Sequence, residues 1–423
     1  MSSYPSFQVA EQATWSLDHW LSYLSAIHPQ NIELGLERVK QVFERLKLDF
    51  NGKTVITVAG TNGKGTTCAM LEQALLMQGK RVAVFSSPHL LDYRERVRVQ
   101  GQMLSSDLHC QAFLHIERAR QDISLTYFEF GTLQALYMML AADCEYLLLE
   151  VGLGGRLDAV NIVDADIAVI TSIDLDHQEW LGNTREAIAA EKAGIFRHGI
   201  PVVIGEPEPP ASLLEAAQQW QVKASWQGQD FSYHTDQQGF HWHNSRTDLA
   251  ALPLPQIPQQ NASTALQVLD VLGFNLTHQQ VSELLARCKL AGRRQVIATG
   301  PTIMLDVAHN PHATRLLAKD IQAQRAKRVI AVVGMLADKD IGQSLQPLLG
   351  IVDRWHCASL DVPRGAKASQ LVSVLTDEKI VLEFENVNAA YRAACEFAQE
   401  DDFIVVFGSF YTVAAVMAVV EAL

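Results

Sequence analysis

Short apolar runs recur along the chain, and most are followed by a glycine-containing loop and then by a stretch with helical spacing. The runs are continuous rather than alternating in polarity, which is typical of strands buried on both faces of a parallel sheet. Because helices must cover those faces, the rhythm predicts an α/β fold. We expect strands at residues 54–59, 81–86, 146–151, 167–172, 201–205, 302–308, 328–334 and 403–408, and helices at, among others, residues 68–79 and 313–326.

The rhythm is interrupted between about residue 220 and residue 258. A polar and aromatic segment with turn signals predicts a hairpin excursion there, and the proline-rich LPLPQIP that follows is typical of an extended connector. A helix is predicted to start near Asn261 and to end before Ala291, after which the second set of strands begins. We therefore predict two domains, residues 1–294 and 295–423, with the hairpin excursion inside the first.

The charge balance limits the partners of this chain. Lys and Arg number 34 against 47 Asp and Glu, which gives a net charge of −13. Such an acidic chain is a poor candidate for wrapping nucleic acid or for lying on an anionic membrane, so we expect neither partner. Phosphate groups must then be bound by local cations, backbone amides or metal ions. Hydrophobic residues make up 48% of the chain, which is enough to bury large cores.

The cysteines and the N-terminal residues indicate a cytoplasmic protein. None of the six cysteines forms a CxxC pair, so they indicate neither a zinc site nor a disulfide framework. The sequence MSSYPSFQVAEQ has neither the basic region nor the apolar core of a secretory signal. A membrane anchor is an alternative for residues 403–420, which carry no charge. We favour a strand, a turn and a helix there, because FIVVF is followed by Gly408 and the flanks are acidic.

The motif VAGTNGKGTT at residues 58–67 lies between a predicted strand and a predicted helix. A glycine-rich loop in this position turns backbone N–H groups and a helix N-terminus toward a phosphate, and Lys64 adds a positive charge. The motif departs from the common P-loop pattern, because Val58 replaces the first glycine and Gly65 replaces the Ser or Thr after the lysine. It therefore predicts phosphate binding, but not an ordinary P-loop NTPase.

Other polar residues follow predicted strands, where the ligands of parallel sheets collect. Glu150 is equally compatible with a metal ligand and with a helix-cap partner. Taken alone, His177 is more readily interpreted as a hydrogen-bonding residue, and Ser87 as a turn or cap residue. Lys192 alone is typical of an exposed lysine in an ion pair.

Several motifs occur in the order in which a known family carries them. They are GTNGKG (60–65), SSPHL (86–90), RERV (94–97), TYFE (126–129), EVGLGGRLDA (150–159), EKAGIFR (191–197), GR (292–293), DVAHNP (306–311) and GSF (408–410). With them the chain resembles the folylpolyglutamate synthases and dihydrofolate synthases of the Mur ligase superfamily over nearly its whole length. The likeness is strongest to bifunctional bacterial members, which add glutamate to both dihydropteroate and folates.

The resemblance implies a P-loop-type α/β ATPase domain followed by a smaller Rossmann-like α/β domain. Residues 1–294 would bind ATP and the pterin, and residues 295–423 would bind glutamate. The implied activity is ATP-dependent ligation of L-glutamate to dihydropteroate, giving dihydrofolate, and to the γ-carboxylate of tetrahydrofolates, giving polyglutamates, through an acyl phosphate. The expected partners are therefore these small molecules, with ATP as a substrate, and the expected oligomeric state is a monomer.

Three alternatives to this activity are kept. In the first, the chain carries only one of the two folate activities, which the motifs do not separate. A cell-wall-precursor amino-acid ligase of the same superfamily would usually have Ser or Thr after the P-loop lysine, where this chain has Gly65. A nucleotide-dependent switch is disfavoured because the chain lacks a recognisable N-K-x-D motif and carries Glu150, His177 and Lys192 together.

The resemblance also assigns residues to ATP and to metal ions. Mg²⁺ is expected at two sites, with Ser87, Glu150 and His177 as ligands, although histidine is an unusual ligand for this ion. A monovalent cation is left open. Lys192 is expected to be carbamylated by CO₂, which requires a desolvated and partly neutral amine, and its carbamate would offer an oxygen to the metal. The residues expected to bind ATP are Gly60, Thr61, Asn62, Gly63, Lys64, Gly65, Thr66, Asn261, Arg293 and Asp306.

The resemblance also assigns residues to domain closure, to glutamate and to the pterin. Arg293, at the predicted domain junction, is expected to reach phosphates from across the cleft and to respond to domain closure. His309 and Ser409 are expected to bind glutamate. Tyr127 and Phe128 have the shape to stack on a flat heterocycle, although buried aromatic residues are more often simple core. The residues expected to bind the pterin are Glu33, Leu34, Gly35, Leu36, Thr126, Tyr127, Phe128, Glu129, Leu157, Asp158 and Ala159.

Overall fold

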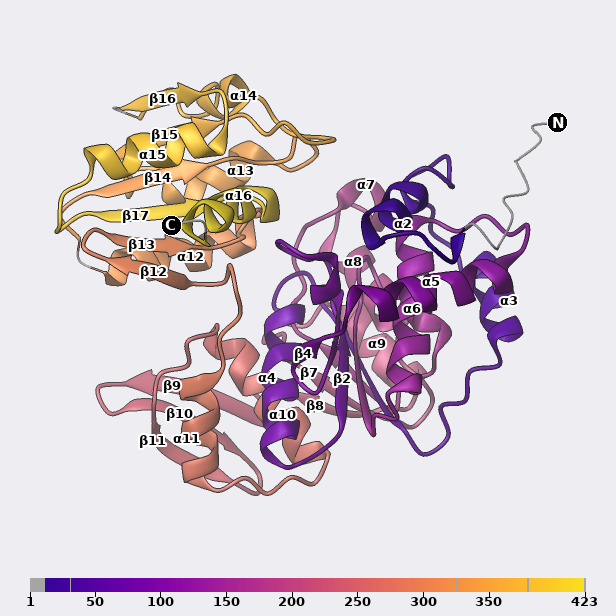
Figure 1. Cartoon of the computed structure of the whole chain (residues 1–423). Helices are drawn as coiled ribbons and strands as arrows, with labels where there is room; N and C mark the ends of the chain where they lie inside the picture. Colours follow the sequence, from indigo (N-terminus) through magenta and orange to yellow (C-terminus); the bar gives the residue numbers. More distant parts are fainter. Residues whose placement is uncertain (1–11, 31, 325, 379, 422–423) are drawn as a thin grey trace. The chain divides into compact units, whose positions relative to one another are not determined.

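The computed structural model of the chain describes residues 12–30, 32–324, 326–378 and 380–421 (Figure 1). Residues 1–11, in which we expected no secretory signal, lie outside the described residues. The chain divides into two compact units: unit 1 comprises Met1–Ile173 and Glu186–Ala286, and unit 2 comprises Asp174–Arg185 and Arg287–Leu423. A short internal segment thus belongs to the unit that is otherwise C-terminal. The predicted domain boundary between residues 294 and 295 remains a prediction.

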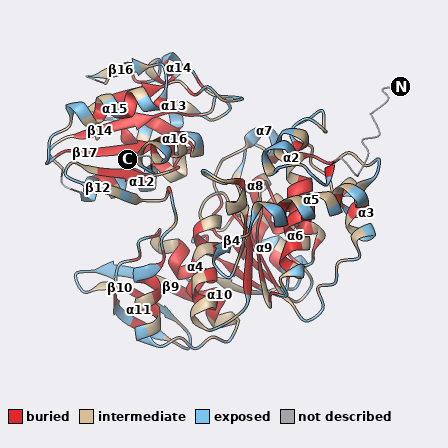
Figure 2. Cartoon of the chain, in the orientation of Figure 1, coloured by how far each residue is buried: buried red, intermediate tan, exposed pale blue. Residues whose placement is uncertain are grey.

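Unit 1 is built on an eight-stranded sheet in the order β4-β3-β2-β5-β1-β6-β7-β8. The strands from β2 to β8 in this order are parallel, and β3 and β4 extend one edge in antiparallel orientation. The central strands are buried, as their continuous apolar runs require (Figure 2). The bounds are β1 Thr54–Ala59, β2 Val82–Phe85, β3 Val97–Val99, β4 Gln102–Met103, β5 Tyr146–Glu150, β6 Ile167–Ile170, β7 Pro201–Ile204 and β8 Lys223–Trp226.

Helices cover both faces of this sheet, with α4 and α10 on one side and α5 and α6 on the other (Figure 1). Helix α4 begins directly after β1, so the phosphate-loop motif connects the central strand to a helix N-terminus. The bounds are α2 Leu17–Leu24, α3 Glu37–Leu46, α4 Lys64–Met77, η1 Tyr93–Arg96, α5 Ser106–Arg120, α6 Tyr127–Ala141, η2 Ala159–Ile162, α8 Arg185–Ala193, α9 Ala211–Gln219, α10 Gln259–Val271 and α11 His278–Arg287.

Unit 1 also contains a three-stranded antiparallel sheet in the order β11-β10-β9. The region predicted as a hairpin excursion therefore contains a third strand, and its first residues differ from the prediction because they form β8 of the main sheet. The bounds are β9 Phe231–Asp236, β10 Gly239–Asn244 and β11 Asp248–Leu252.

The prediction of a single helix from near Asn261 to before Ala291 is wrong, because two helices, α10 and α11, occupy this region. Gly273 has a φ of +82°, which an L side chain rarely adopts and which ends the first helix. The Thr277 hydroxyl accepts from the Gln280 N–H, and the Gln280 side chain accepts from the Thr277 N–H, so the second helix starts with a capping box.

Unit 2 is built on a six-stranded sheet in the order β12-β13-β17-β14-β15-β16, in which only β12 is antiparallel. Side chains of α12, α13 and α14 join one core cluster with its strands, while α15 and α16 pack together on the sheet. The bounds are α7 Gln178–Leu181, β12 Gln295–Thr299, β13 Thr302–Leu305, α12 Pro311–Ala323, β14 Val329–Val333, α13 Ile341–Leu345, η3 Gln346–Leu348, β15 Arg354–Ala358, α14 Ala368–Val372, β16 Val381–Phe384, α15 Val387–Phe397, β17 Phe403–Phe407 and α16 Phe410–Glu421.

The predicted fold class is confirmed, since each predicted strand range contains an observed strand and both main sheets are largely parallel. The strands that the rhythm missed include β12, β15 and β16, whose short runs carry polar or charged residues. Residues 403–420 form β17 and α16, which confirms the strand, turn and helix favoured there. None of the helices within the described residues is long and apolar enough to cross a membrane.

Candidate functional site

The phosphate-loop motif forms a tight turn between β1 and α4 that requires its glycines. Gly63 caps α4 with a φ of +88°, and a Cβ on it would lie 2.4 Å from Oδ1 of Asn261. A Cβ on Gly60 would lie 1.9 Å from the hydroxyl oxygen of Thr171. Side chains at either position are therefore excluded, and the loop leads directly into a helix N-terminus, where backbone N–H groups favour a phosphate.

Two other elements hold this loop in place. At the end of β6, the Thr171 hydroxyl donates to the Asn62 carbonyl at 2.6 Å, and the Asn62 N–H donates to the Ser172 hydroxyl at 3.1 Å. In the first turn of α10, the Asn261 amide donates to the Thr66 hydroxyl at 2.6 Å. Asn261 and the phosphate loop are far apart in sequence, and both were predicted to bind ATP. The structure brings them into direct contact.

The Lys64 ammonium folds back over the same loop. It donates to the carbonyl of Gly60 at 2.9 Å and to that of Thr61 at 3.3 Å. Both of these acceptors are neutral carbonyls, and the ammonium places a positive charge beside the helix N-terminus, where an anion is favoured.

Glu150 and Ser87 lie together at the carboxyl ends of neighbouring strands. Glu150 ends β5 and is only 5% exposed, and its carboxylate accepts from the Ser87 N–H at 3.1 Å. Burial, followed by the Glu150 charge, raises the pKa of the Cys68 thiol in α4, so the field of this carboxylate reaches the helix after the loop. A carboxylate and a hydroxyl are oxygen donors of the kind that a hard divalent cation prefers.

His177, the third predicted metal ligand, belongs to the segment that is grouped with unit 2. It is the N-cap residue of α7 and has a φ of +51°. Its backbone N–H donates to the Asp176 carboxylate at 2.8 Å within this unit.

Lys192 is buried, in contrast to the exposed position that is typical of a lysine in such a context. It lies near the end of α8 and is 4% exposed. A Cβ on Gly155 would lie 3.0 Å from the Lys192 Cα, so the GLGGR loop packs closely against the backbone of this residue.

The three motifs assigned to the pterin converge in unit 1. Arg38 forms ion pairs with both Glu33 and Glu129, and thereby connects ELGL to TYFE. A Cβ on Gly152 would lie 2.6 Å from the Phe128 ring, which connects TYFE to the GLGGR loop. Leu36, Tyr127, Phe128 and Ala159 all contribute to one core cluster. Sequence reasoning missed Arg38, which has no motif of its own.

Asp158 organises the loop after β5. Its carboxylate accepts from the N–H groups of Leu153 at 2.8 Å and Val160 at 3.0 Å, and it caps η2. Burial raises the pKa of Asp158 to about 6, and these hydrogen bonds and the Lys64 charge limit the rise. This predicted pterin residue therefore lies close enough to the phosphate loop to interact with its lysine.

In unit 2, the residues predicted to bind ATP and glutamate lie around Phe410. The Arg293 guanidinium lies 5.2 Å from the centre of the Phe410 ring, and the His309 ring lies 6.3 Å from it. Burial raises the pKa of Asp306, while the Arg293 charge opposes the rise. Ser409 is buried, and its hydroxyl lies 2.8 Å from that of Thr412, so part of its role is to start α16.

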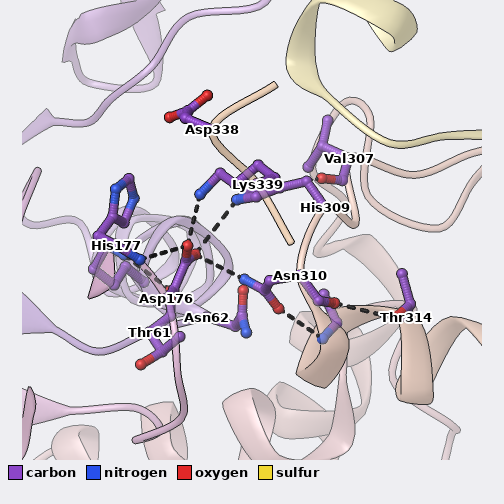
Figure 3. A network of polar contacts seen from close by, with 12 residues as sticks. Thr61, Asn62, Asp176, His177, Val307, His309, Asn310, Thr314, Asp338 and Lys339 are labelled. Carbon is purple, nitrogen blue, oxygen red and sulfur yellow. Dashed lines mark hydrogen bonds and ion pairs between the residues drawn. The ribbon is translucent and has the colours of Figure 1, made fainter. Parts of the chain in front are cut away.

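A network around Asp176 joins the internal segment to the rest of unit 2 (Figure 3). The Asp176 carboxylate accepts from Lys339 at 2.6 Å, from the Asn310 amide at 2.9 Å and from the His177 N–H at 2.8 Å. His309 Nε2 lies 3.7 Å from the same carboxylate. Burial opposes ionisation of Asp176, but His309 and Lys339 hold its pKa well below the usual range. No motif or spacing in the sequence pointed to Asp176 or Lys339.

Asp176→Ala is expected to reduce the free energy of unfolding by about 3 kcal/mol, because it leaves a buried ammonium without its carboxylate. The Asp176 and Lys339 side chains are only 10% and 9% exposed. Asp174→Ala is the matched control, since its partner Arg315 is mostly exposed and such pairs contribute about 0–1 kcal/mol. Urea unfolding of both variants measures the difference, and equal midpoints would contradict the role given to Asp176.

Two family profiles match the chain. They are "Mur ligase middle domain", over residues 58–269, and "Mur ligase, glutamate ligase domain", over residues 292–410. Among curated relatives, the dihydrofolate synthase/folylpolyglutamate synthase of Escherichia coli strain K12 is 48% identical over 412 residues, which cover 97% of each chain.

Solved structures agree with these matches. A structure of Escherichia coli FolC in complex with DHPP and ADP is 48% identical, has a TM-score of 0.93, and the match covers 97% of this chain and 99% of that one. A bifunctional folylpolyglutamate synthase/dihydrofolate synthase with Mn, AMPPNP and L-glutamate bound is 50% identical, with a TM-score of 0.90 and the same two coverages.

Proposed function

The chain belongs to the Mur ligase family and, within it, to the dihydrofolate synthase/folylpolyglutamate synthases, and on this premise we propose the reaction that it catalyses. It is an ATP-dependent ligase that adds L-glutamate to dihydropteroate, giving dihydrofolate, and to the γ-carboxylate of tetrahydrofolates, giving polyglutamates. The observation that carries this function is 48% identity to a relative of that name over 97% of both chains.

The phosphate loop supports ATP as the energy source of this reaction. A carboxylate does not react with an amine until it is activated, and phosphoryl transfer from ATP makes it an acyl phosphate that the glutamate amine can attack. Catalysis of such a transfer is mainly positioning and neutralisation of charge. Lys64 and the N–H groups at the start of α4 would neutralise the phosphates, while Asn261 supports the loop. Gly65 after the lysine disfavours a cell-wall-precursor ligase.

Relatives bind Mn with a nucleotide analogue, and for this chain we propose Mg²⁺ near Glu150 and Ser87. The fit rests on the buried Glu150 carboxylate and on the oxygen donors at this sheet edge. A bound Mg²⁺ would neutralise phosphate charge. His177 is proposed as a further ligand, with two metal sites in total, and a monovalent cation stays an open part of the proposal.

Lys192 is proposed to be carbamylated. Only the free amine reacts with CO₂, and burial disfavours the charged ammonium, so the buried position of Lys192 supports this modification. The product is an anion that offers oxygen atoms at a position where an unmodified lysine would offer only protons.

The other substrates are assigned by their chemistry. The Tyr127 and Phe128 rings, near the Arg38 bridge, would bind the flat pterin. His309 and Ser409 would bind glutamate in unit 2, where Asp176 and Lys339 fix the surrounding loops. The remaining residues of the three pterin motifs and of the phosphate loop keep the roles predicted for them.

We also propose that the enzyme acts in the cytoplasm as a monomer. The acidic net charge supports a protein that binds neither nucleic acid nor an anionic membrane, and the six free cysteines support a reducing compartment.

An ADP-release assay tests the proposed function. We expect ADP to form when ATP and L-glutamate are supplied with dihydropteroate, and again when they are supplied with tetrahydrofolate. Omission of L-glutamate should stop turnover in both cases. Release with only one of the two acceptors would reduce the function to a single folate activity, and release with neither would overturn it.

Arg293→Ala is expected to lower kcat on the order of 10²-fold, as the loss of one dedicated charge contact to a phosphate does. The melting temperature should change much less than kcat, because Arg293 is only half-buried and packs on the Phe410 ring. Arg294→Ala is the control, since Arg294 pairs with Asp320 at 2.8 Å and has no proposed contact with ATP. A large melting shift with normal kcat in Arg293→Ala would make this residue structural.

A further inference from the structure

The β9–β10 hairpin of unit 1 carries a cluster of metal-binding side chains that includes none of the proposed ligase residues. His234 on β9 is the direct cross-strand partner of His241 on β10, so the two side chains leave the same face of the hairpin. Asp236 follows His234 by two residues in the same strand and therefore shares that face. The turn after Asp236 then returns the chain into β10.

The three side chains are close enough to share one ion. Their ligand atoms all lie within 4.8 Å of one another, and no other such group was found among the residues that the structure describes. The two imidazole rings stack with centroids 4.4 Å apart and planes inclined by 10°. His241 Nε2 lies 2.9 Å from Asp236 Oδ1. Bonds of about 2.0–2.2 Å to one ion would require the exposed His234 ring to turn out of the stack, so that the lone pairs of both imidazoles point at the ion.

The backbone that carries the cluster is fixed. Phe240 and Trp242, which flank His241 in β10, are buried. A Cβ on Gly239 would lie 2.3 Å from the Leu252 carbonyl oxygen, so β10 packs tightly on β11. The turn also orients Asp236, whose Oδ1 accepts from the Gln238 N–H at 2.7 Å. Little conformational entropy would therefore be lost on binding an ion.

We propose that His234, Asp236 and His241 bind one divalent transition-metal ion, of which Zn²⁺ is the representative. Two imidazole nitrogens and one carboxylate oxygen suit Zn²⁺, Co²⁺ or Ni²⁺ better than Mg²⁺. Three protein ligands leave a coordination position for water, and the ion enters from solvent because His234 and Asp236 are exposed. The proposal is independent of the ligase function, and the scattered cysteines gave no sign of it.

A bound ion has a defined structural effect. It replaces the hydrogen bond between His241 and Asp236 and connects both strands beside the turn, while the displaced proton goes to solvent. Helix α10, which packs against β9, carries the Asn261 contact to the phosphate loop.

Calorimetric titration of the full-length protein with Zn²⁺, in excess Mg²⁺, tests this site. The variants are His234→Ala and Asp236→Asn, which change exposed side chains, and the matched control is His243→Ala. His243 also lies on β10, but its Nε2 is 2.8 Å from the Ser232 hydroxyl and it is not in the cluster. Melting curves of all variants verify that they are folded, and Co²⁺ absorption spectra report the coordination.

Wild type and His243→Ala are each expected to bind one Zn²⁺. In His234→Ala and Asp236→Asn the affinity for Zn²⁺ should fall at least ~100-fold, because even the loss of a residue that only hydrogen-bonds to a metal ligand lowers metal affinity by up to that factor. Ligase activity with Mg²⁺ should be equal in all four proteins. Unchanged Zn²⁺ affinity and stoichiometry in both cluster variants would overturn the site, as would a wild type that binds no Zn²⁺ in excess Mg²⁺.

Discussion

Lys64→Ala is expected to abolish ligation while the protein remains folded. The Lys64 ammonium lies over the phosphate loop, 2.9 Å from the Gly60 carbonyl, where we propose that it neutralises the phosphates of ATP. A dedicated cation in a phosphoryl-transfer site contributes on the order of 10³–10⁵ in rate, and this contribution should be lost. The side chain is half-buried and belongs to no core cluster, so the melting temperature should stay near that of wild type. ADP release and a melting curve measure both effects.

Two further variants sharpen this test. Lys64→Arg should also be inactive, because a planar guanidinium does not reproduce the compact ammonium at the same position. Lys53→Ala is the control, since Lys53 stands just before β1 and pairs with the exposed Asp143. Its kcat should equal that of wild type. Wild-type kcat in Lys64→Ala would refute the assignment of the loop.

Lys192→Ala is expected to reduce kcat on the order of 10³-fold. If Lys192 carries a carbamate, the alanine variant loses an anion from a buried position, and electrostatic groups in such sites contribute on this scale. A small carboxylic acid such as acetate, added at high concentration, should partly restore activity by occupying the vacated space. Lys192→Arg should not restore it, because a guanidinium stays protonated and is not carbamylated.

The carbamate itself is observable by ¹³C NMR. Wild type supplied with ¹³C-bicarbonate should show a carbamate resonance that Lys192→Ala lacks. Glu191→Ala is the neighbouring control, because Glu191 pairs with the exposed Arg156 and should keep both the resonance and the activity. A fully active wild type without the resonance would exclude the modification.

The sequence alone determined the fold class and the positions of the main strands along the chain. Continuous β-branched runs such as those of β1 and β17 are recognisable without a structure, because burial on both faces imposes a local composition. The same holds for the phosphate loop, since Gly60 and Gly63 have conformations or neighbours that admit no side chain. Short polar edge strands and the break between α10 and α11 lack such a local signature and were missed.

The tertiary structure decided which predicted residues meet and which unpredicted ones support them. Arg38 pairs with Glu129, and Asp176 with Lys339, across sequence separations that no local pattern encodes. Lys192 has the neighbours of a surface lysine in sequence, yet the packing of the GLGGR loop buries it. Periodicity and spacing report the contacts of a residue with its near neighbours in the chain. Burial, pKa and partners between distant segments depend on how the elements pack, and only the folded chain defines them.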